Sequence, residues 1–129
     1  MLFVYLNQVY LILGGFMKIA IVGSRNVAVN DIGKYISEVE EIVTGGAAGV
    51  DTCAAEYANK NGIKLTVFLP QYKRYGKAAP IVRNKKIVDY ADKVLAFWDG
   101  SSKGTLSVIE YSRRIAKPIE VIVFEKEQK

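Results

Sequence analysis

Short apolar runs alternate with longer segments of helical period along most of this chain. Runs rich in Val, Ile and Phe predict five strands, at 18–22, 41–44, 64–69, 93–98 and 119–124. Between them, helical spacing of apolar positions predicts helices at 30–38, 50–61, 79–90 and 105–115. Strands that are almost continuously apolar are typical of a sheet covered by helices on both faces. We therefore expect one Rossmann-like, doubly wound α/β domain with a mainly parallel five-stranded sheet.

The order of the strands decides which loops meet. Right-handed crossovers favour the order 3-2-1-4-5, in which the winding reverses between the first and fourth strands. Ligands of such sheets bind beyond the carboxyl ends of the strands at that reversal. The segments to inspect for function are therefore Gly23-Ser24-Arg25 after the first strand, residues 45–51 after the second, and residues 99–104 after the fourth.

An apolar N-terminal extension, MLFVYLNQVYLILGGF, precedes the predicted domain of residues 17–129. It is too short to span a bilayer and lacks the basic start and small-residue cleavage site of a secretory signal, so we expect no membrane association. Met17 opens a typical strand, and our hypothesis is that it is the natural start. The alternative is an apolar arm that covers a sheet edge or a partner.

The composition excludes some kinds of catalytic and metal chemistry but does not identify a binding partner. The 18 Lys and Arg against 13 Asp and Glu give a net charge of +5, which favours an anionic partner but is also common among ordinary surfaces. With no His, imidazole metal sites and Ser-His or Cys-His catalysis are excluded. A single cysteine, Cys53, allows no internal disulfide and suits the cytoplasm. We expect neither a cofactor nor a metal.

The stretch IVTGGAAGVD, residues 42–51, loses its large side chains directly after the second strand. Gly45, Gly46, Ala47 and Gly49 lie between that strand and a helix start, where free N–H groups and the helix dipole attract an anion. Bare backbone would let a phosphate or ribose approach closely. Asp51 would then accept hydrogen bonds from ribose hydroxyls or act as an acid or base.

A structural alternative exists for the same stretch. A tight turn with close helix-sheet packing would explain two of the glycines, and Asp51 would compensate the helix dipole. The pattern is neither G-x-G-x-x-G nor the Walker A loop, which disfavours dehydrogenase and P-loop NTPase functions.

A second glycine-rich turn, DGSSKGT, comes after the fourth strand. Backbone and hydroxyl groups converge there at another predicted helix start, which favours phosphate binding. The candidate residues are Asp99, Gly100, Ser101, Ser102, Gly104 and Thr105. The alternative is a plain turn with Thr105 as the N-cap, and Glu110 is by default a solvated helix residue. Arg25, directly after the first strand, could grip phosphate bidentately or form a solvent salt bridge.

The third connection, QYKRYGKAAPIVRNKKI, mixes basic and aromatic residues. Lys73, Arg74 and Lys77 lie beside Tyr72 and Tyr75. Such a mixture suits single-stranded nucleic acid or a nucleotide base, through phosphate pairing and stacking. A charged, solvent-facing lid is an equal alternative. Within the following helix, the pair Arg83-Asn84 could turn inward to the site.

The motifs GSR, GGAAGVD, RN and WDGSSKGT, in this order, resemble the SLOG superfamily, in particular its small YspA-like and YpsA-related branch. The resemblance covers essentially residues 17–124. It assigns ligand-binding positions to Gly23, Ser24, Arg25, Gly45, Gly46, Gly49, Asp51, Arg83, Asn84, Ser102, Gly104 and Thr105. It implies a Rossmann-like domain that binds a nucleotide or a nucleotide-derived ligand.

Relatives in that superfamily suggest two activities. The lonely-guy phosphoribohydrolases release a base from a nucleoside monophosphate, and their Glu three residues after the Thr is Val108 here, with Glu110 two residues further. A hydrolase of this kind would use Asp51 or Glu110 at the glycosidic bond. The DNA-processing protein A family binds single-stranded DNA. We therefore expect nucleotide binding by a homo-oligomer, a dimer, with single-stranded nucleic-acid binding as the alternative. A third hypothesis is a ligand-free oligomer unit that uses the apolar N-terminal arm.

Overall fold

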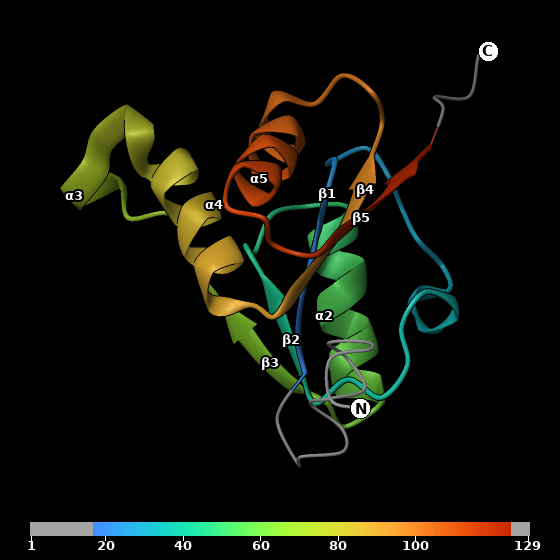
Figure 1. Ribbon diagram of the computed structural model, residues 1–129. Helices are drawn as coiled ribbons and strands as arrows, with labels where there is room; N and C mark the ends of the chain where they lie inside the picture. The colour runs from blue at the N-terminus through green and yellow to red at the C-terminus, as the bar shows by residue number, and fades with distance from the viewer. Residues whose placement is uncertain (1–16, 125–129) are drawn as a thin grey trace, which may run out of the picture.

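Five parallel strands form one sheet in the computed structural model, which describes residues 17–124 of the 129 (Figure 1). The strands are β1 Lys18–Gly23, β2 Glu41–Thr44, β3 Lys64–Val67, β4 Lys93–Trp98 and β5 Ile119–Val123. Their order is β3-β2-β1-β4-β5, with every pairing parallel. The predicted fold class and strand order are confirmed, and the winding reverses between β1 and β4. The prediction for residues 1–16 lies outside the described residues.

Helices cover both faces of the sheet. The longer ones are α2 Val50–Lys60, α4 Ala79–Tyr90 and α5 Lys103–Arg114, and the short ones are η1 Ile32–Lys34, α3 Tyr72–Tyr75 and η2 Gly76–Ala78. Figure 1 shows α2 on one side of the sheet and α4 and α5 on the other. Within the described part of the chain, no helix is long and apolar enough to cross a bilayer.

Alternation along β1 divides the core into two halves. Ile19 and Ile21 belong to a buried cluster with α2, whereas Ala20 and Val22 belong to a cluster with α4 and α5. Successive side chains of a strand point to opposite faces, so a strand covered on both sides must be apolar at every position. This explains the near-continuous apolar runs in the sequence. It also fixes the carboxyl end of β1 between α2 and α5.

The predicted helix at 30–38 is wrong, because only the short η1 forms there. Gly33 lowers helix propensity, and the position its Cβ would occupy is 2.9 Å from the Tyr57 hydroxyl of α2. Glu38 has a positive φ of 47°, which ends any helical run. Ile32 is nevertheless buried, so the segment packs its apolar residues on the core without a regular helix.

Two predicted boundaries also shift by two residues, and several others by one. The third strand ends at Val67 rather than 69, and the connection after it contains α3 and η2, which periodicity did not predict. The last helix begins at Lys103 rather than 105, because the side chain of Ser102, not Thr105, caps it and accepts from the Thr105 N–H. The turn after β4 is therefore shorter than expected, and its hydroxyls belong to a helix start.

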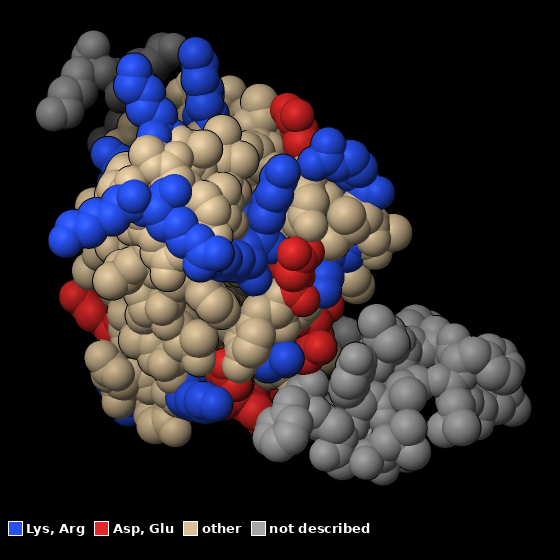
Figure 2. Space-filling model, turned by 90° about the vertical axis from the view of Figure 1, so that its left-hand side faces the viewer, with Lys and Arg blue, Asp and Glu red and all other residues tan. Residues whose placement is uncertain are grey.

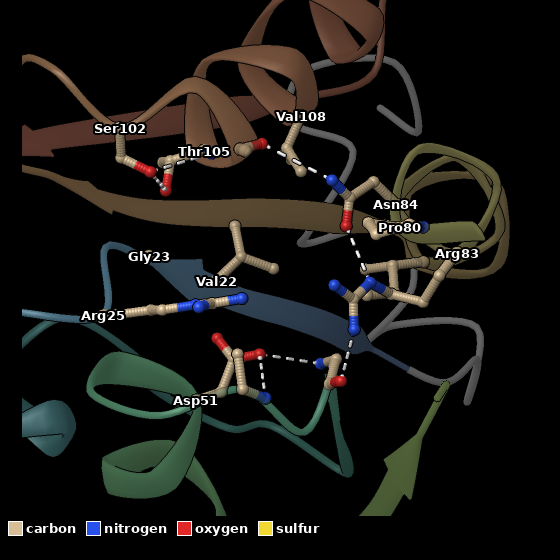
Figure 3. A pocket seen from close by; sticks show the side chains of 14 residues that line it. Val22, Gly23, Arg25, Asp51, Pro80, Arg83, Asn84, Ser102, Thr105 and Val108 are labelled. Carbon is tan, nitrogen blue, oxygen red and sulfur yellow. Dashed lines mark hydrogen bonds between the residues drawn. The ribbon is translucent and has the colours of Figure 1, made fainter. Parts of the chain in front are cut away.

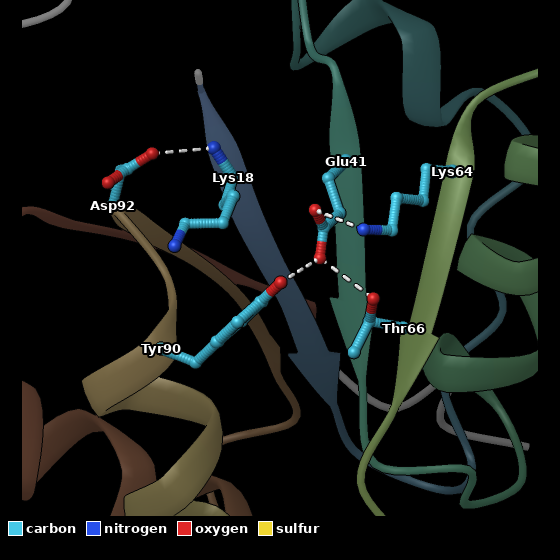
Figure 4. Close-up of polar contacts among 6 residues, drawn as sticks. All are labelled: Lys18, Glu41, Lys64, Thr66, Tyr90 and Asp92. Atoms are coloured by element: carbon cyan, nitrogen blue, oxygen red, sulfur yellow. Dashed lines mark hydrogen bonds and ion pairs between the residues drawn. The ribbon is translucent and has the colours of Figure 1, made fainter. Parts of the chain in front are cut away.

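The amino edge of the sheet is closed by a polar network (Figure 4). Glu41 Oε2 accepts from the Tyr90 hydroxyl at 2.5 Å and from the Thr66 hydroxyl at 2.7 Å, and Glu41 Oε1 lies 3.5 Å from Lys64 Nζ. Burial raises the pKa of Glu41, but these partners outweigh it and hold that pKa below its ordinary value. The network ties α4 and β3 to the start of β2.

Candidate functional site

A cavity lies at the carboxyl edge of the sheet, at the reversal between β1 and β4 (Figure 3). It is lined by Val22, Gly23, Arg25, Gly45, Ala47, Asp51, Pro80, Arg83, Asn84, Ile87, Ser102, Gly104, Thr105 and Val108. Its volume is about 130 Å³. The loops after β1 and β2, the start of α5 and one face of α4 thus meet around one space, as the strand order predicts.

Asp51, in the first turn of α2, is the carboxylate of this cavity. It is only 5% exposed, and its Oδ2 accepts from the N–H groups of Gly45 at 3.0 Å and Ala47 at 3.2 Å. Its other oxygen takes part in none of the hydrogen bonds drawn in Figure 3. Asp51 therefore braces the glycine-rich turn through Oδ2, and the backbone N–H of Gly23, at the end of β1, also acts on its carboxylate.

Burial raises the pKa of Asp51 above its ordinary value. The N–H groups of Ala47 and Gly45, and the charge of Arg83, act in the opposite direction but do not outweigh burial. A carboxyl whose pKa is raised within a cavity is better suited to exchange a proton near neutral pH than an ordinary aspartate.

Two guanidinium groups face the same space. Arg83, on α4, donates through Nη1 to the Gly45 carbonyl and through Nε to Asn84 Oδ1 at 2.8 Å. Burial, and in lesser part the charge of Arg25, lowers the pKa of Arg83, while Asp51 raises it. Figure 3 shows Arg25 extending into the cavity between Val22 and Asp51. Two cations against one carboxylate give the cavity a net positive charge.

Asn84 holds α4 against the start of α5. Its Nδ2 lies 3.2 Å from Ser107 Oγ and 3.4 Å from the Gly104 carbonyl, both within donating distance. Because its Oδ1 accepts from Arg83, Asn84 also fixes the direction of that guanidinium. The predicted Arg83-Asn84 pair therefore does turn inward, as one hydrogen-bonded unit.

Most of the predicted glycines are required by packing. A Cβ on Gly23 would lie 2.5 Å from the Phe97 carbonyl, and one on Gly49 would lie 2.4 Å from the Arg25 carbonyl. Gly46 has φ of 74°, and its Cβ would meet Leu69 at 2.7 Å. A Cβ on Gly104, in contrast, would meet nothing within 4 Å. The same is true of Gly100, which has a φ of 85°, so among the predicted glycines the backbone is open at these two positions and packed at Gly23, Gly46 and Gly49.

The turn after β4 is organised by Asp99. Its Oδ1 accepts from the N–H groups of Ser101 at 2.9 Å and Ser102 at 2.7 Å, and these bonds lower the pKa of Asp99 to about 2. Ser24 is fully buried, and its hydroxyl accepts from the Asp99 N–H at 3.1 Å. Asp99 and Ser24 thus stabilise the turn, but neither residue lines the cavity.

Ten of the predicted site residues line the cavity: Gly23, Arg25, Gly45, Ala47, Asp51, Arg83, Asn84, Ser102, Gly104 and Thr105. Six predicted ligand residues lie outside its lining: Ser24, Gly46, Gly49, Asp99, Gly100 and Ser101. Glu110 lines a different depression, of about 330 Å³, between α4 and α5. The structure therefore does not bring Glu110 together with Asp51.

Sequence reasoning missed the apolar part of the lining: Val22, Pro80, Ile87 and Val108. A signal for three of them was present. Pro80 and Ile87 lie three and four residues from the Arg83-Asn84 pair, and Val108 lies four from Gly104, so each shares a helix face with a predicted residue.

Comparison of the chain with protein-family models, with curated proteins and with solved structures gave no match. The resemblance to the SLOG superfamily stays a prediction from the sequence motifs. Among residues 17–124, no group of three or more Cys, Asp and Glu side chains is placed to hold a metal ion. The site must therefore be interpreted from its own chemistry.

Proposed function

We propose that this chain binds a nucleotide or a nucleotide-derived ligand in the cavity at the carboxyl edge of the sheet. The observation that carries the proposal is the convergence of Arg25, Arg83, Asp51 and the start of α5 on one space. Two guanidinium groups and a helix N-terminus favour an anion, and a carboxylate beside them suits the hydroxyls of a sugar.

The phosphate is best assigned to Arg25, Arg83 and the first turn of α5. The N–H groups of Gly45 and Ala47 donate to Asp51, so the turn after β2 has fewer free donors than its sequence suggests. At α5, the Thr105 N–H donates to the Ser102 hydroxyl, but the N–H groups of Lys103 and Gly104 have no partner within the helix, and nothing lies within 4 Å of the Cβ position of Gly104. Asp51, which lines the same cavity, would accept from a ribose hydroxyl.

The size of the cavity limits what it encloses. Sites that bury a whole drug-sized ligand usually measure roughly 300–1,000 Å³, and this one measures about 130 Å³. A phosphate and part of a ribose match that volume, so the base would lie outside the enclosed part. This supports a ligand that is anchored by its sugar phosphate.

The activity that this arrangement supports beyond binding is hydrolysis of the N-glycosidic bond. Asp51 is the carboxylate of the cavity: its ionised form would stabilise an oxocarbenium-like centre, and its raised pKa suits it to take a proton from a positioned water. Glu110 takes no part in this proposal, because it lines another depression. Release of free base from a nucleoside monophosphate, absent in Asp51→Asn, tests it.

Binding is tested with ribose 5-phosphate and AMP by calorimetry on Arg25→Ala. Arg25 is exposed, so its removal should leave the fold intact. Loss of hydrogen bonds to a charged group costs about 1.5–3 kcal/mol, which weakens binding about tenfold to a hundredfold. Arg113→Ala, which removes the same charge from an exposed position in the last turn of α5, is the matched control. Equal affinities of the two variants for both ligands would refute the site.

The second candidate function is binding of single-stranded nucleic acid across α3 and α4. Figure 2 looks onto this side of the molecule and shows Lys and Arg side chains crossing it in a band. Lys73, Arg74 and Lys77 are exposed there. Oligonucleotide affinity should fall steeply with salt, and neutralising these three residues should abolish it while mononucleotide binding persists.

A cytoplasmic location and a homodimeric state complete the proposal. The lone Cys53 suits a reducing compartment. Sedimentation of the purified chain tests the dimer.

A further inference from the structure

Six large apolar side chains are exposed in the described part of the chain. Three of them lie close together in the sequence, between the last residue of β3 and the first residue of α3. Val67 is 42% exposed, Leu69 is 64% exposed and Tyr72 is 59% exposed. Exposed apolar side chains are ordinary when scattered, but a group of them marks a surface that something covers.

This group adjoins the cavity. Leu69 and Val67 lie against Gly46, 2.7 Å and 3.1 Å from where its Cβ would be, and both neighbours of Gly46 line the cavity. Tyr72 lies near enough to Arg83 for its charge to affect the pKa of that guanidinium. Val67 and Leu69 therefore lie beside the turn that lines the cavity, just outside its lining.

Tyr72 differs from two other tyrosines of this region. Tyr75 already has Arg74 at 5.2 Å and Lys86 at 5.4 Å from its ring centre. Tyr111 has Lys85 at 5.7 Å and Arg114 at 5.4 Å. Among the described residues, no such cation contact is seen at Tyr72. Tyr72 is exposed, whereas Tyr75 and Tyr111 are half-buried, so its ring is the most accessible of the three for stacking.

We propose that Tyr72 and Leu69 form a stacking platform for the base of the ligand whose phosphate lies in the cavity. The inference rests on the proposed function and extends it, because it selects nucleoside phosphates over sugar phosphates. A base that does not fit into 130 Å³ would lie outside the cavity, and Leu69 is an exposed apolar side chain beside the turn that lines it. Stacking on one open face is tolerant of base identity, so purine and pyrimidine nucleotides should both bind.

The test compares AMP with ribose 5-phosphate by calorimetry on the full chain. The wild type should bind AMP about tenfold more tightly than ribose 5-phosphate, as expected for one stacked base. Tyr72→Ala should remove that preference without changing the affinity for ribose 5-phosphate, while Tyr72→Phe should keep it. Tyr75→Ala, at a ring covered by cations, is the matched control and should also keep it.

Each outcome separates the two proposals. Equal binding of AMP and ribose 5-phosphate by the wild type, or equal weakening of both in Tyr72→Ala, overturns the platform and leaves the phosphate site standing. Absence of binding of either ligand overturns the proposed function itself. If Tyr72→Ala instead converts a dimer to a monomer in sedimentation, with the AMP preference intact, the surface belongs to a second copy and the platform is refuted. Melting temperatures confirm that the variants fold.

Discussion

Asp51 shows how one buried side chain can serve structure and chemistry together. Its Oδ2 satisfies two N–H groups of the turn that precedes its own helix, and the residue also lines the cavity. The same turn therefore needs the carboxylate whether or not a ligand is present. A stability measurement therefore tests the contact of Asp51 with the turn, and a binding measurement tests its contact with a ligand.

Asp51→Ala should lower the free energy of unfolding by about 1–3 kcal/mol, because it leaves the buried Gly45 N–H without an acceptor. Asp51→Asn keeps an acceptor oxygen and should cost clearly less. Urea denaturation of both variants near neutral pH checks this. If the two variants were equally stable, the bracing role of the Oδ2 atom would be excluded.

Asp99 should make the free energy of unfolding depend on pH in the acidic range. Its pKa is about 2 in the folded protein, below the ordinary value of 3.8, because the ionised form accepts from Ser101 and Ser102. The stabilisation is therefore fully present above pH 3.8 and is lost as the pH falls from 3.8 towards 2. The free energies of unfolding of the wild type and of Asp99→Asn, measured across this pH range, should become equal at its acidic end. A constant difference would contradict the shift.

At the scale of elements, the turn before α2 is held by contact with the loop after β1. The Cβ of a residue at 49 would lie 2.4 Å from the Arg25 carbonyl and 2.7 Å from the Ser24 carbonyl. Gly49 also has φ of 76° and ψ of −120°, a conformation almost confined to glycine. Close packing of two backbone segments thus sets the wall of the cavity.

Gly49→Ala should destabilise the protein by about 2–5 kcal/mol, since strain and a backbone clash add. Gly62→Ala is the control for the backbone conformation alone. Gly62 also has a positive φ, of 65°, but nothing lies within 4 Å of its Cβ position, so the cost should be about 1–2 kcal/mol. Thermal unfolding of the two variants compares them, and similar losses would show that the close approach of the loops does not matter.

Across the whole molecule, the two edges of the sheet have different tasks. The amino edge is closed by the Glu41 network, whereas the carboxyl edge keeps an open cavity with two cations. A protein stabilised at one edge can tolerate an unfilled, charged space at the other. Stability and binding should therefore be separable by mutation.

Glu41→Ala should lower the free energy of unfolding by about 1–3 kcal/mol, because Tyr90 and Thr66 lose a charged acceptor. Its affinity for AMP, measured by calorimetry below the melting range, should stay within about twofold of wild type, because the cavity lies at the other edge. Arg25→Ala should behave in the opposite way, with near-normal stability and weakened binding. Loss of both properties in either variant would show that the edges are coupled.

The sequence by itself determined the parallel sheet, its strand order and the loops that meet at its carboxyl edge, because doubly buried strands and right-handed crossovers leave their marks in periodicity. Only the tertiary structure decided which loop residues line the cavity and which pack against neighbouring backbone. Whether Gly23 and Gly49 face a ligand or a neighbouring backbone depends on contacts between segments far apart in the chain. The same holds for the missing helix at 30–38, where Gly33 packs against Tyr57, and for Glu110, which lines a different depression from Asp51. The local pattern of apolar residues determines the helices and strands. The neighbours of a side chain, in contrast, are determined by how all these elements pack together.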